Sequence, residues 1–174
     1  MVFDLNKSIE ILERTPAIVT ALLQGLSSEW LFNNEGADTW SPYDIIGHYI
    51  EGEKTDWIPR MRIILSNDDD KRFVPFDRFA QLNNDKNKPS AALLHEFAEW
   101  RKNNILELKE ANLNEENLNK KGIHPVFGEV TLRQLLAAWV AHDVNHIHQI
   151  SRVMAKQYKE EIGPWTKYIS VVNK

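Results

Sequence analysis

Hydrophobic periodicity is the feature that most constrains what this chain can fold into. Apolar residues recur three or four positions apart along four long segments, and the alternation typical of half-buried strands is nearly absent. A helix with one apolar face needs other elements to cover that face. The sequence therefore predicts an all-α fold in the form of a four-helix bundle.

Capping signals and prolines set the expected ends of the first two helices. The first is expected over residues 2–25, with a kink or an interruption at Pro16, because proline lacks an amide donor and crowds the preceding turn. The second is expected over residues 42–65. Ser41 is its predicted N-cap, and Pro59 is expected to kink it.

A polar connection and two further helices follow. Residues 66–88 are rich in Asp, Asn and Lys, and their length predicts a long crossover connection rather than a tight hairpin. The third helix is expected over residues 90–111. The fourth, expected over residues 131–158, begins with Thr131 and Gln134 in capping-box positions and has the longest uninterrupted apolar pattern.

Two segments outside these helices have less regular patterns. The stretch around Gly122, Pro125 and Gly128 is predicted to be a loop. The C-terminal tail is unusually aromatic, and its apolar residues recur at helical spacing, so we expect it to pack against the end of the bundle or against a second chain. These tail residues are Ile162, Trp165, Tyr168, Ile169 and Val172.

Length and composition limit the class of protein. The 174 residues predict one domain over residues 1–174, and the net charge of −4 argues against a nucleic-acid binder. Because the chain has no cysteine, a metal site can use only histidine, carboxylates and water. The longest apolar run, residues 135–141, is far shorter than the roughly 20 residues that span a membrane. The first residues do not resemble a secretory signal, so a cytoplasmic location is the default expectation.

The segment AHDVNHIHQI in the fourth predicted helix has the clearest chemical pattern. His142 and His146 are four residues apart, so they lie on one helix face one turn apart, the spacing by which one helix supplies two imidazoles to a metal ion. Both fall on the apolar stripe, whereas His148 points about 120° away and lies outside the site. A pair of hydrogen-bonded core histidines is the alternative interpretation.

Other polar residues are considered with this pair. His48 in the second predicted helix is a third candidate ligand, because bundle cores build metal sites from side chains on facing helices. Gln149 has the best direction to hydrogen-bond a ligand histidine. We expect Asp143 to serve a neighbouring helix or solvent, and Glu53 to be a structural or solvated carboxylate rather than a general base.

Four tryptophans and one further histidine are assigned by their positions. Trp100 and Trp139 fit core stripes at helical spacing. Trp40 and Trp165 are less regular, and either is expected to line a pocket mouth or a dimer contact. His124 is interpreted as part of a loop rather than as a ligand.

Three motifs resemble the DinB/YfiT-like superfamily of metal-dependent enzymes. They are WSPYDIIGHYIEGE at residues 40–53, HPVFGEVTLRQLL at residues 124–136 and AHDVNHIHQISR at residues 141–152, and with their spacing they cover nearly the whole chain. The resemblance implies a four-helix bundle with a crossover connection, and often a homodimer. It also implies that one histidine of the second helix and two of the fourth bind a divalent metal ion. Matched residue by residue, the implied ligands are His48, His142 and His146.

The resemblance also limits the chemistry. Three imidazoles suit Zn²⁺ and also Ni²⁺, Fe²⁺, Mn²⁺ or Co²⁺, so ligand type does not choose the metal, and they leave at least one coordination position open. The family implies transfer of an external low-molecular-weight thiol, such as bacillithiol or mycothiol, to a small electrophilic substrate. Metal-dependent hydrolysis remains an alternative. So does a non-catalytic, stress-associated metal-binding or structural protein. No catalytic residue is assigned.

Overall fold

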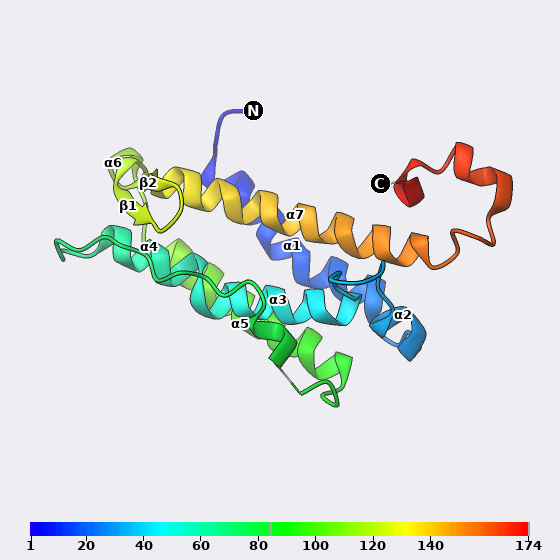
Figure 1. The fold of residues 1–174 in the computed structure, drawn as a ribbon. Helices are drawn as coiled ribbons and strands as arrows, with labels where there is room; N and C mark the ends of the chain where they lie inside the picture. Colours follow the sequence, from blue (N-terminus) through cyan, green and yellow to red (C-terminus); the bar gives the residue numbers. More distant parts are fainter. Residues whose placement is uncertain (84, 174) are drawn as a thin grey trace.

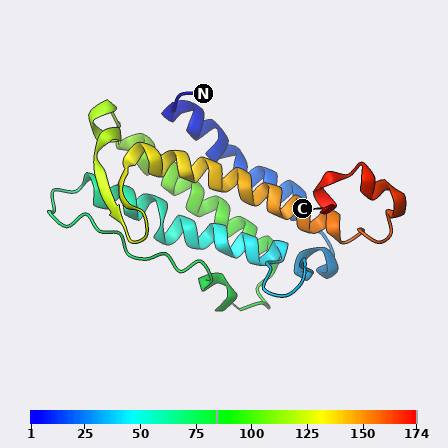
Figure 2. The same ribbon diagram turned by 45° about the horizontal axis from the view of Figure 1, so that its top comes forward.

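The computed structural model describes residues 1–83 and 85–173, and four helical rods side by side form its body (Figure 1, Figure 2). The rods are α1 (Leu5–Leu23), α3 (Pro42–Thr55) continued by α4 (Trp57–Leu65), α5 (Ser90–Glu110) and α7 (Leu132–Lys156). Both α1 and α3 pack against α5 and α7, so the first two rods lie across the bundle from each other. The predicted four-helix bundle is confirmed.

The first rod is not interrupted at its proline, which excludes one of the two effects predicted there. Asp4 caps α1, its side chain accepting a hydrogen bond from the Lys7 amide at 2.9 Å, and the helix then runs through Pro16 without interruption. Proline has no N–H to donate to the carbonyl four residues earlier. That carbonyl belongs to Leu12, and the Arg101 guanidinium of α5 donates to it at 2.7 Å instead. A side chain from another helix therefore satisfies the group that the proline leaves free.

The second rod is broken rather than kinked. Its start is as predicted, because Ser41 and Asp44 form a capping box at the N-terminus of α3. The break falls at Asp56, between α3 and α4, and not at Pro59. The proline ring crowds the carbonyl four residues before it, that of Thr55, which is where α3 ends. Asp56 then pairs with Arg60 across the first turn of α4, with 2.6 Å between Oδ1 and Nη1.

The segment predicted as a loop before the fourth helix is a β-hairpin. Strands β1 (Lys121–His124) and β2 (Gly128–Thr131) pair antiparallel, with Gly122 opposite Val130. Strands of four residues are too short to show an alternating pattern. Gly122 is required by packing, because a Cβ atom there would lie 2.3 Å from the Phe73 ring.

Short helical elements fill the remaining connections. They are α2 (Ser28–Phe32), α6 (Glu115–Asn119) and the 3₁₀ turns η1 (Ala80–Asn83), η2 (Gly163–Lys167) and η3 (Ser170–Asn173). The predicted crossover connection runs from the end of α4 to the start of α5, and η1 within it packs against α3 (Figure 2). No helix in the described part of the chain is long and apolar enough to cross a membrane.

The core consists of two apolar clusters with a polar layer between them. One cluster lies toward the hairpin and includes Leu12 and Trp139; the other lies toward α2 and includes Val19 and Ile150. Along each helix, the buried polar residues of the layer fall between members of the two clusters. These residues are Thr15, Glu53, Arg101 and Asp143.

Arg101 is the centre of this polar layer. Its guanidinium donates to Glu53 Oε1 at 2.7 Å and to Asp143 Oδ2 at 2.6 Å. Trp139 Nε1 and Asn104 Nδ2 complete the hydrogen bonds of Glu53, at 3.2 and 2.9 Å. Burial alone would raise the pKa of Asp143, but the charge of Arg101 lowers it below its ordinary value. With the bond to the Leu12 carbonyl, Arg101 on α5 links α1, α3 and α7 at one level.

The expectation that Trp100 lies in the core is wrong, whereas packing of the tail against a second chain stays a prediction. Trp139 is fully buried as predicted, but Trp100 is 38% exposed. In the tail, Val172 is buried, whereas Trp165, Tyr168 and Ile169 are exposed, and the segment forms an arc beyond the end of α7 (Figure 1). Helical spacing alone did not distinguish a face turned to the core from one turned to solvent.

Replacing Arg101 with Gln is expected to lower the free energy of unfolding by about 3–5 kcal/mol, because two buried carboxylates lose their counter-charge. Arg62→Gln is the matched control, since its pair with Glu107 is exposed and contributes less than about 1 kcal/mol. Chemical denaturation measures both. Neutralising Glu53 and Asp143 together, as Gln and Asn, should recover much of the loss in the Arg101 variant. Equal losses of stability for Arg101→Gln and Arg62→Gln would contradict the role of Arg101 as the counter-charge of the two buried carboxylates.

The part that the exposed tail plays in a homodimer stays a prediction. Shortening the chain to end at Gly163 removes Trp165, Tyr168 and Ile169, whose exposed apolar surface favours contact with a second copy. We expect the shortened chain to elute as a single copy in gel filtration, where the full chain elutes as a dimer. An unchanged elution volume together with an unchanged Tm would show that the tail neither stabilises the bundle nor contacts a second chain.

Candidate metal centre

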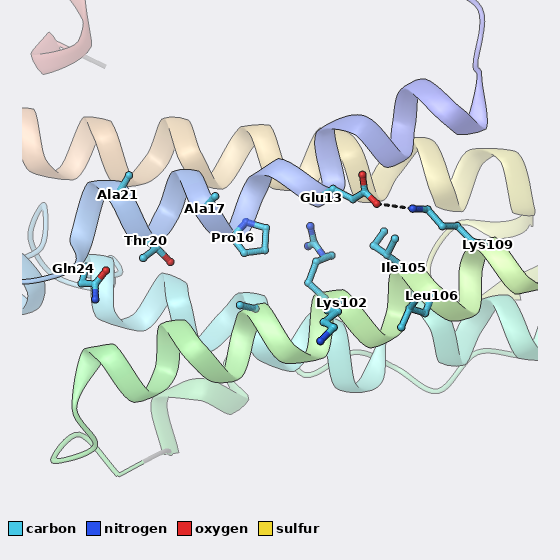
Figure 3. A pocket seen from close by; sticks show the side chains of 12 residues that line it. Glu13, Pro16, Ala17, Thr20, Ala21, Gln24, Lys102, Ile105, Leu106 and Lys109 are labelled. Atoms are coloured by element: carbon cyan, nitrogen blue, oxygen red, sulfur yellow. Dashed lines mark hydrogen bonds and ion pairs between the residues drawn. The ribbon is translucent and has the colours of Figure 1, made fainter.

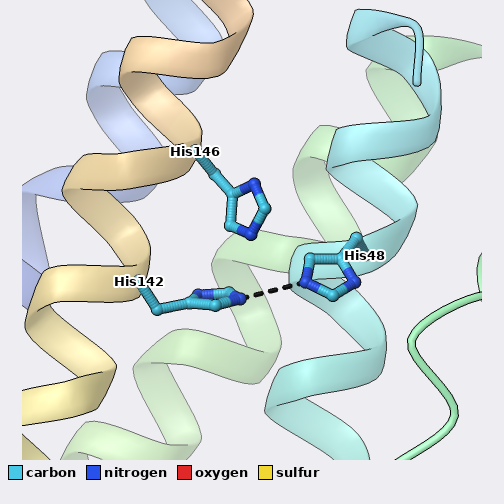
Figure 4. Close-up of side chains that lie close together, drawn as sticks. All are labelled: His48, His142 and His146. Atoms are coloured by element: carbon cyan, nitrogen blue, oxygen red, sulfur yellow. Dashed lines mark hydrogen bonds between the residues drawn. The ribbon is translucent and has the colours of Figure 1, made fainter. Parts of the chain in front are cut away.

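Three histidine side chains from two facing helices converge in the bundle. His48 comes from α3, and His142 and His146 come from successive turns of α7 (Figure 4). The Nε2 atoms of His48 and His142 lie 3.0 Å apart. One ring nitrogen from each of the three residues lies within 4.8 Å of the others. The structure thus brings together the three side chains that the sequence pattern singled out.

Local contacts hold α3 and α7 in the register that this cluster needs. The capping boxes at Ser41 and Thr131 fix where the two helices begin. The Tyr49 hydroxyl, next to His48 in sequence, donates to the backbone carbonyl of Asp143 at 2.8 Å. This buried bond joins the two helices directly beside the histidines.

Burial keeps two of the histidines in the form that can bind a metal. His48 is 5% exposed and His146 is 7% exposed. Burial, followed by the charges of the neighbouring histidines, lowers the pKa of His48 to about 2. Burial and the charge of His142 lower the pKa of His146 to about 4. Both rings are therefore neutral at pH 7, each with a nitrogen lone pair.

Hydrogen bonds orient one of the rings. Nδ1 of His146 donates to Oε1 of Gln149 at 2.7 Å, which leaves the lone pair on Nε2. Gln149 therefore makes the contact predicted for it. The buried Nδ1 atoms of His48 and His142 make no hydrogen bond with any described residue. Nδ1 of His142 lies 3.8 Å from a carboxylate oxygen of Asp143.

The arrangement fits a divalent metal ion. Two imidazole nitrogens that bind one ion at about 2.1 Å are about 3.4 Å apart in a tetrahedral site and about 3.0 Å apart at a right angle. The Nε2 atoms of His48 and His142, which share a hydrogen bond at 3.0 Å, lie at the short end of that range. Three imidazoles are ligands of Zn²⁺ and of other divalent first-row metals, and three protein ligands leave open positions, as catalytic sites require.

Aromatic rings surround the cluster and limit its contact with water. The Trp40 ring centre lies 4.7 Å from that of His48, and Trp57 lies 5.0 Å from His142. Phe76, from the crossover connection, meets His48 edge-on at 5.5 Å. This connection had no predicted part in the site, because its sequence is mostly polar.

A cavity of about 350 Å³ opens beside His146. Trp40, His146 and Gln149 form part of its wall, together with the charged residues Arg78 and Arg152. Trp40 thus lines a pocket, as one of its two expected roles requires. The cavity gives a small molecule a route to one side of the histidine cluster.

A larger cavity of about 720 Å³ lies elsewhere, between α1 and α5 (Figure 3). Its wall is mostly apolar and includes Pro16, Ala17 and Ile105, with the Glu13–Lys109 ion pair at one end. None of the three clustered histidines lines it. The larger of these two cavities is therefore not the one beside the histidines.

The other residues weighed from sequence lie outside the cluster. His148 is exposed, and His124, at the end of β1 rather than in a loop, uses Nδ1 to accept hydrogen bonds from the Val126 and Phe127 amides of the hairpin turn. Glu53 is a structural carboxylate bound by Arg101, as expected. Asp143 also binds Arg101, so it serves a neighbouring helix, as expected.

Comparison with known proteins agrees with this fold. The fold is similar to that of YfiT from Bacillus subtilis, described as a probable metal-dependent hydrolase with an unusual four-helix bundle topology. The TM-score is 0.75 at 18% sequence identity, over 88% of this chain and 87% of that chain. The curated proteins gave no match. The family model of the DinB superfamily matches residues 11–150, and the chain therefore belongs to the DinB superfamily.

Proposed function

We propose that this protein is a divalent-metal-dependent enzyme whose metal ligands are His48, His142 and His146, and that it transfers a small-molecule thiol to an electrophilic substrate. One observation carries the metal proposal: three imidazoles from two helices converge beside a cavity. A divalent ion held there supplies Lewis acidity, which deprotonates a coordinated thiol outright and lowers the pKa of a coordinated water.

The carboxylates beside the histidines in the bundle favour a thiol over water, whereas Asp38, exposed in the cavity wall, keeps hydrolysis as a second candidate. Hydrolysis generally uses a carboxylate or another base that is free to take a proton. Asp143, beside His142, and Glu53, on the helix of His48, are both bound by Arg101. Asp56 is bound by Arg60. A thiol has less need of such a base, and because the chain has no cysteine the thiol must come from a small molecule.

The protein's own residues position the reactants. Gln149 fixes the orientation of the His146 ring, and the rings of Trp40 and Phe76 exclude water from one side of His48. In the proposed reaction, the thiol sulfur forms a bond to the electrophilic carbon, the leaving group departs with the electron pair of its broken bond, and the thiol proton goes to solvent. A metal-dependent hydrolase is the second candidate, because YfiT is described as one.

His142→Ala is expected to abolish metal binding and leave a folded bundle, because both apolar clusters form without the cluster histidines. His148→Ala is the matched control, since His148 is exposed on the same helix. Metal analysis after dialysis and far-ultraviolet circular dichroism measure the two properties. Loss of helical signal in the His142 variant alone would make the metal structural, and equal metal content in both variants would refute the ligand assignment.

The chemistry is tested with the metal-loaded protein and 1-chloro-2,4-dinitrobenzene. We expect conjugation that requires bacillithiol or cysteine, releases chloride, and is lost in His142→Ala but kept in His148→Ala. Hydrolysis of 4-nitrophenyl acetate without any thiol is the parallel assay. Hydrolysis alone would favour the second candidate. Bound metal with neither activity would favour a non-catalytic metal-binding protein.

A further inference from the structure

The cavity beside His146 has an unpaired positive charge in its wall. Arg78 belongs to the connection between α4 and α5, and its guanidinium lies 5.9 Å from the centre of the Trp40 ring and 5.3 Å from that of Phe79. Within residues 1–83 and 85–173, no carboxylate forms an ion pair with it. Rings of this kind hold a guanidinium in place without neutralising its charge.

The other charges of this wall are largely compensated. Glu35 receives two hydrogen bonds from the Arg152 guanidinium, at 2.8 and 2.7 Å, and lies 3.0 Å from the ammonium of Lys156. These contacts use both Glu35 and Arg152 to fasten the segment before α3 onto α7. Asp38, which is exposed, is the remaining charged residue of the wall besides Arg78.

A second hydrogen-bond donor lies in the same wall. The Oε1 atom of Gln149 is occupied by His146, so its amide nitrogen, which makes no hydrogen bond to a described residue, is available to a ligand. A guanidinium and an amide N–H₂ in one cavity are the donors that recognise a carboxylate.

Arg78 also lies near the histidines. The Trp40 ring next to Arg78 lies 4.7 Å from the His48 ring and 6.1 Å from the His146 ring. Arg78 and His146 line the same cavity, so a ligand that pairs with Arg78 lies beside the cluster.

We propose that Arg78 is a specificity-determining residue and that the cavity takes a small organic anion, whose carboxylate pairs with Arg78 while its reacting end reaches His48, His142 and His146. The inference rests on the proposed function for the identity of the reacting end. The volume of about 350 Å³ suits a small molecule, because ligand pockets begin at about 300 Å³. The Arg78 guanidinium can form two parallel hydrogen bonds to a carboxylate.

Three thiols of equal length test the proposal: 3-mercaptopropionate, 3-mercapto-1-propanol and 3-aminopropane-1-thiol. Each is titrated into the Co²⁺-loaded full chain, and the sulfur-to-cobalt absorption band gives its Kd. We expect the carboxylate to bind about tenfold more tightly than the alcohol, because hydrogen bonds to a charged group are strong but an exposed guanidinium is screened. This preference should decrease as ionic strength rises.

Variants of two arginines of the same connection make the test specific. Arg78→Gln should reduce the preference to within about twofold, and Arg78→Lys, which keeps the charge, should retain most of it. Arg72→Gln is the matched control, since Arg72 pairs with Asp70 and lies outside the cavity. Equal binding of the carboxylate and the alcohol to the unaltered chain would overturn the proposal. So would an equal effect of Arg72→Gln, or tightest binding of the amine, which would assign selectivity to Asp38.

The same titrations on metal-free protein separate this inference from the proposed function. Tryptophan fluorescence is the readout there, because Trp40 lines the cavity. If cobalt does not bind but the carboxylate is still preferred in an Arg78-dependent way, the metal proposal fails and the anion site stands. If cobalt binds and neither form of the protein prefers the carboxylate, the metal proposal stands and the role of Arg78 is refuted.

Discussion

The buried guanidinium of Arg101 is the interaction on which the rest of this fold depends. From α5 it binds Glu53 of α3, Asp143 of α7 and the Leu12 carbonyl of α1, so one side chain contacts all the other rods of the bundle. Buried ion pairs seldom add much net stability compared with apolar packing, but a misaligned pair leaves a buried charge without its partner, which is strongly destabilising. The polar layer therefore fixes the register of the helices relative to one another. Asp143 adjoins His142, so fixing the layer also fixes the histidines.

The sequence predicted the parts of the fold that rest on repeated patterns. Helical periodicity gave the bundle, and capping boxes gave the starts of α3 and α7. Prolines were harder to interpret, because their effect depends on what else can satisfy the freed carbonyl. At Pro16 another helix supplies Arg101 and α1 continues, whereas the second rod breaks a turn before Pro59. The hairpin was missed because its strands are only four residues long.

In the candidate site, too, the sequence predicted the residues that follow a helical pattern and missed those placed by tertiary contacts. Spacing along one helix placed His142 and His146 together, and the pattern of the second helix added His48. The contact of Gln149 with His146 followed from helix geometry. No periodicity could have placed Phe76 or Arg78, since they lie in an irregular connection whose path is set by tertiary contacts. Residues that surround the candidate ligand site were thus harder to predict from the sequence than residues that would bind the metal. Loops commonly carry such roles on a rigid scaffold.

The three charges of the polar layer also restrict how this protein can change over evolutionary time. Replacing Arg101 alone leaves two buried carboxylates without their counter-charge, at a cost of about 3–5 kcal/mol, which is a large part of the stability of an ordinary domain. Replacing Glu53 or Asp143 alone leaves Arg101 paired with the other carboxylate. An apolar layer of similar volume is therefore reached most easily when the carboxylates change before Arg101 does. We therefore expect the three residues of the layer to be retained together, while substitutions accumulate more easily at the positions around them.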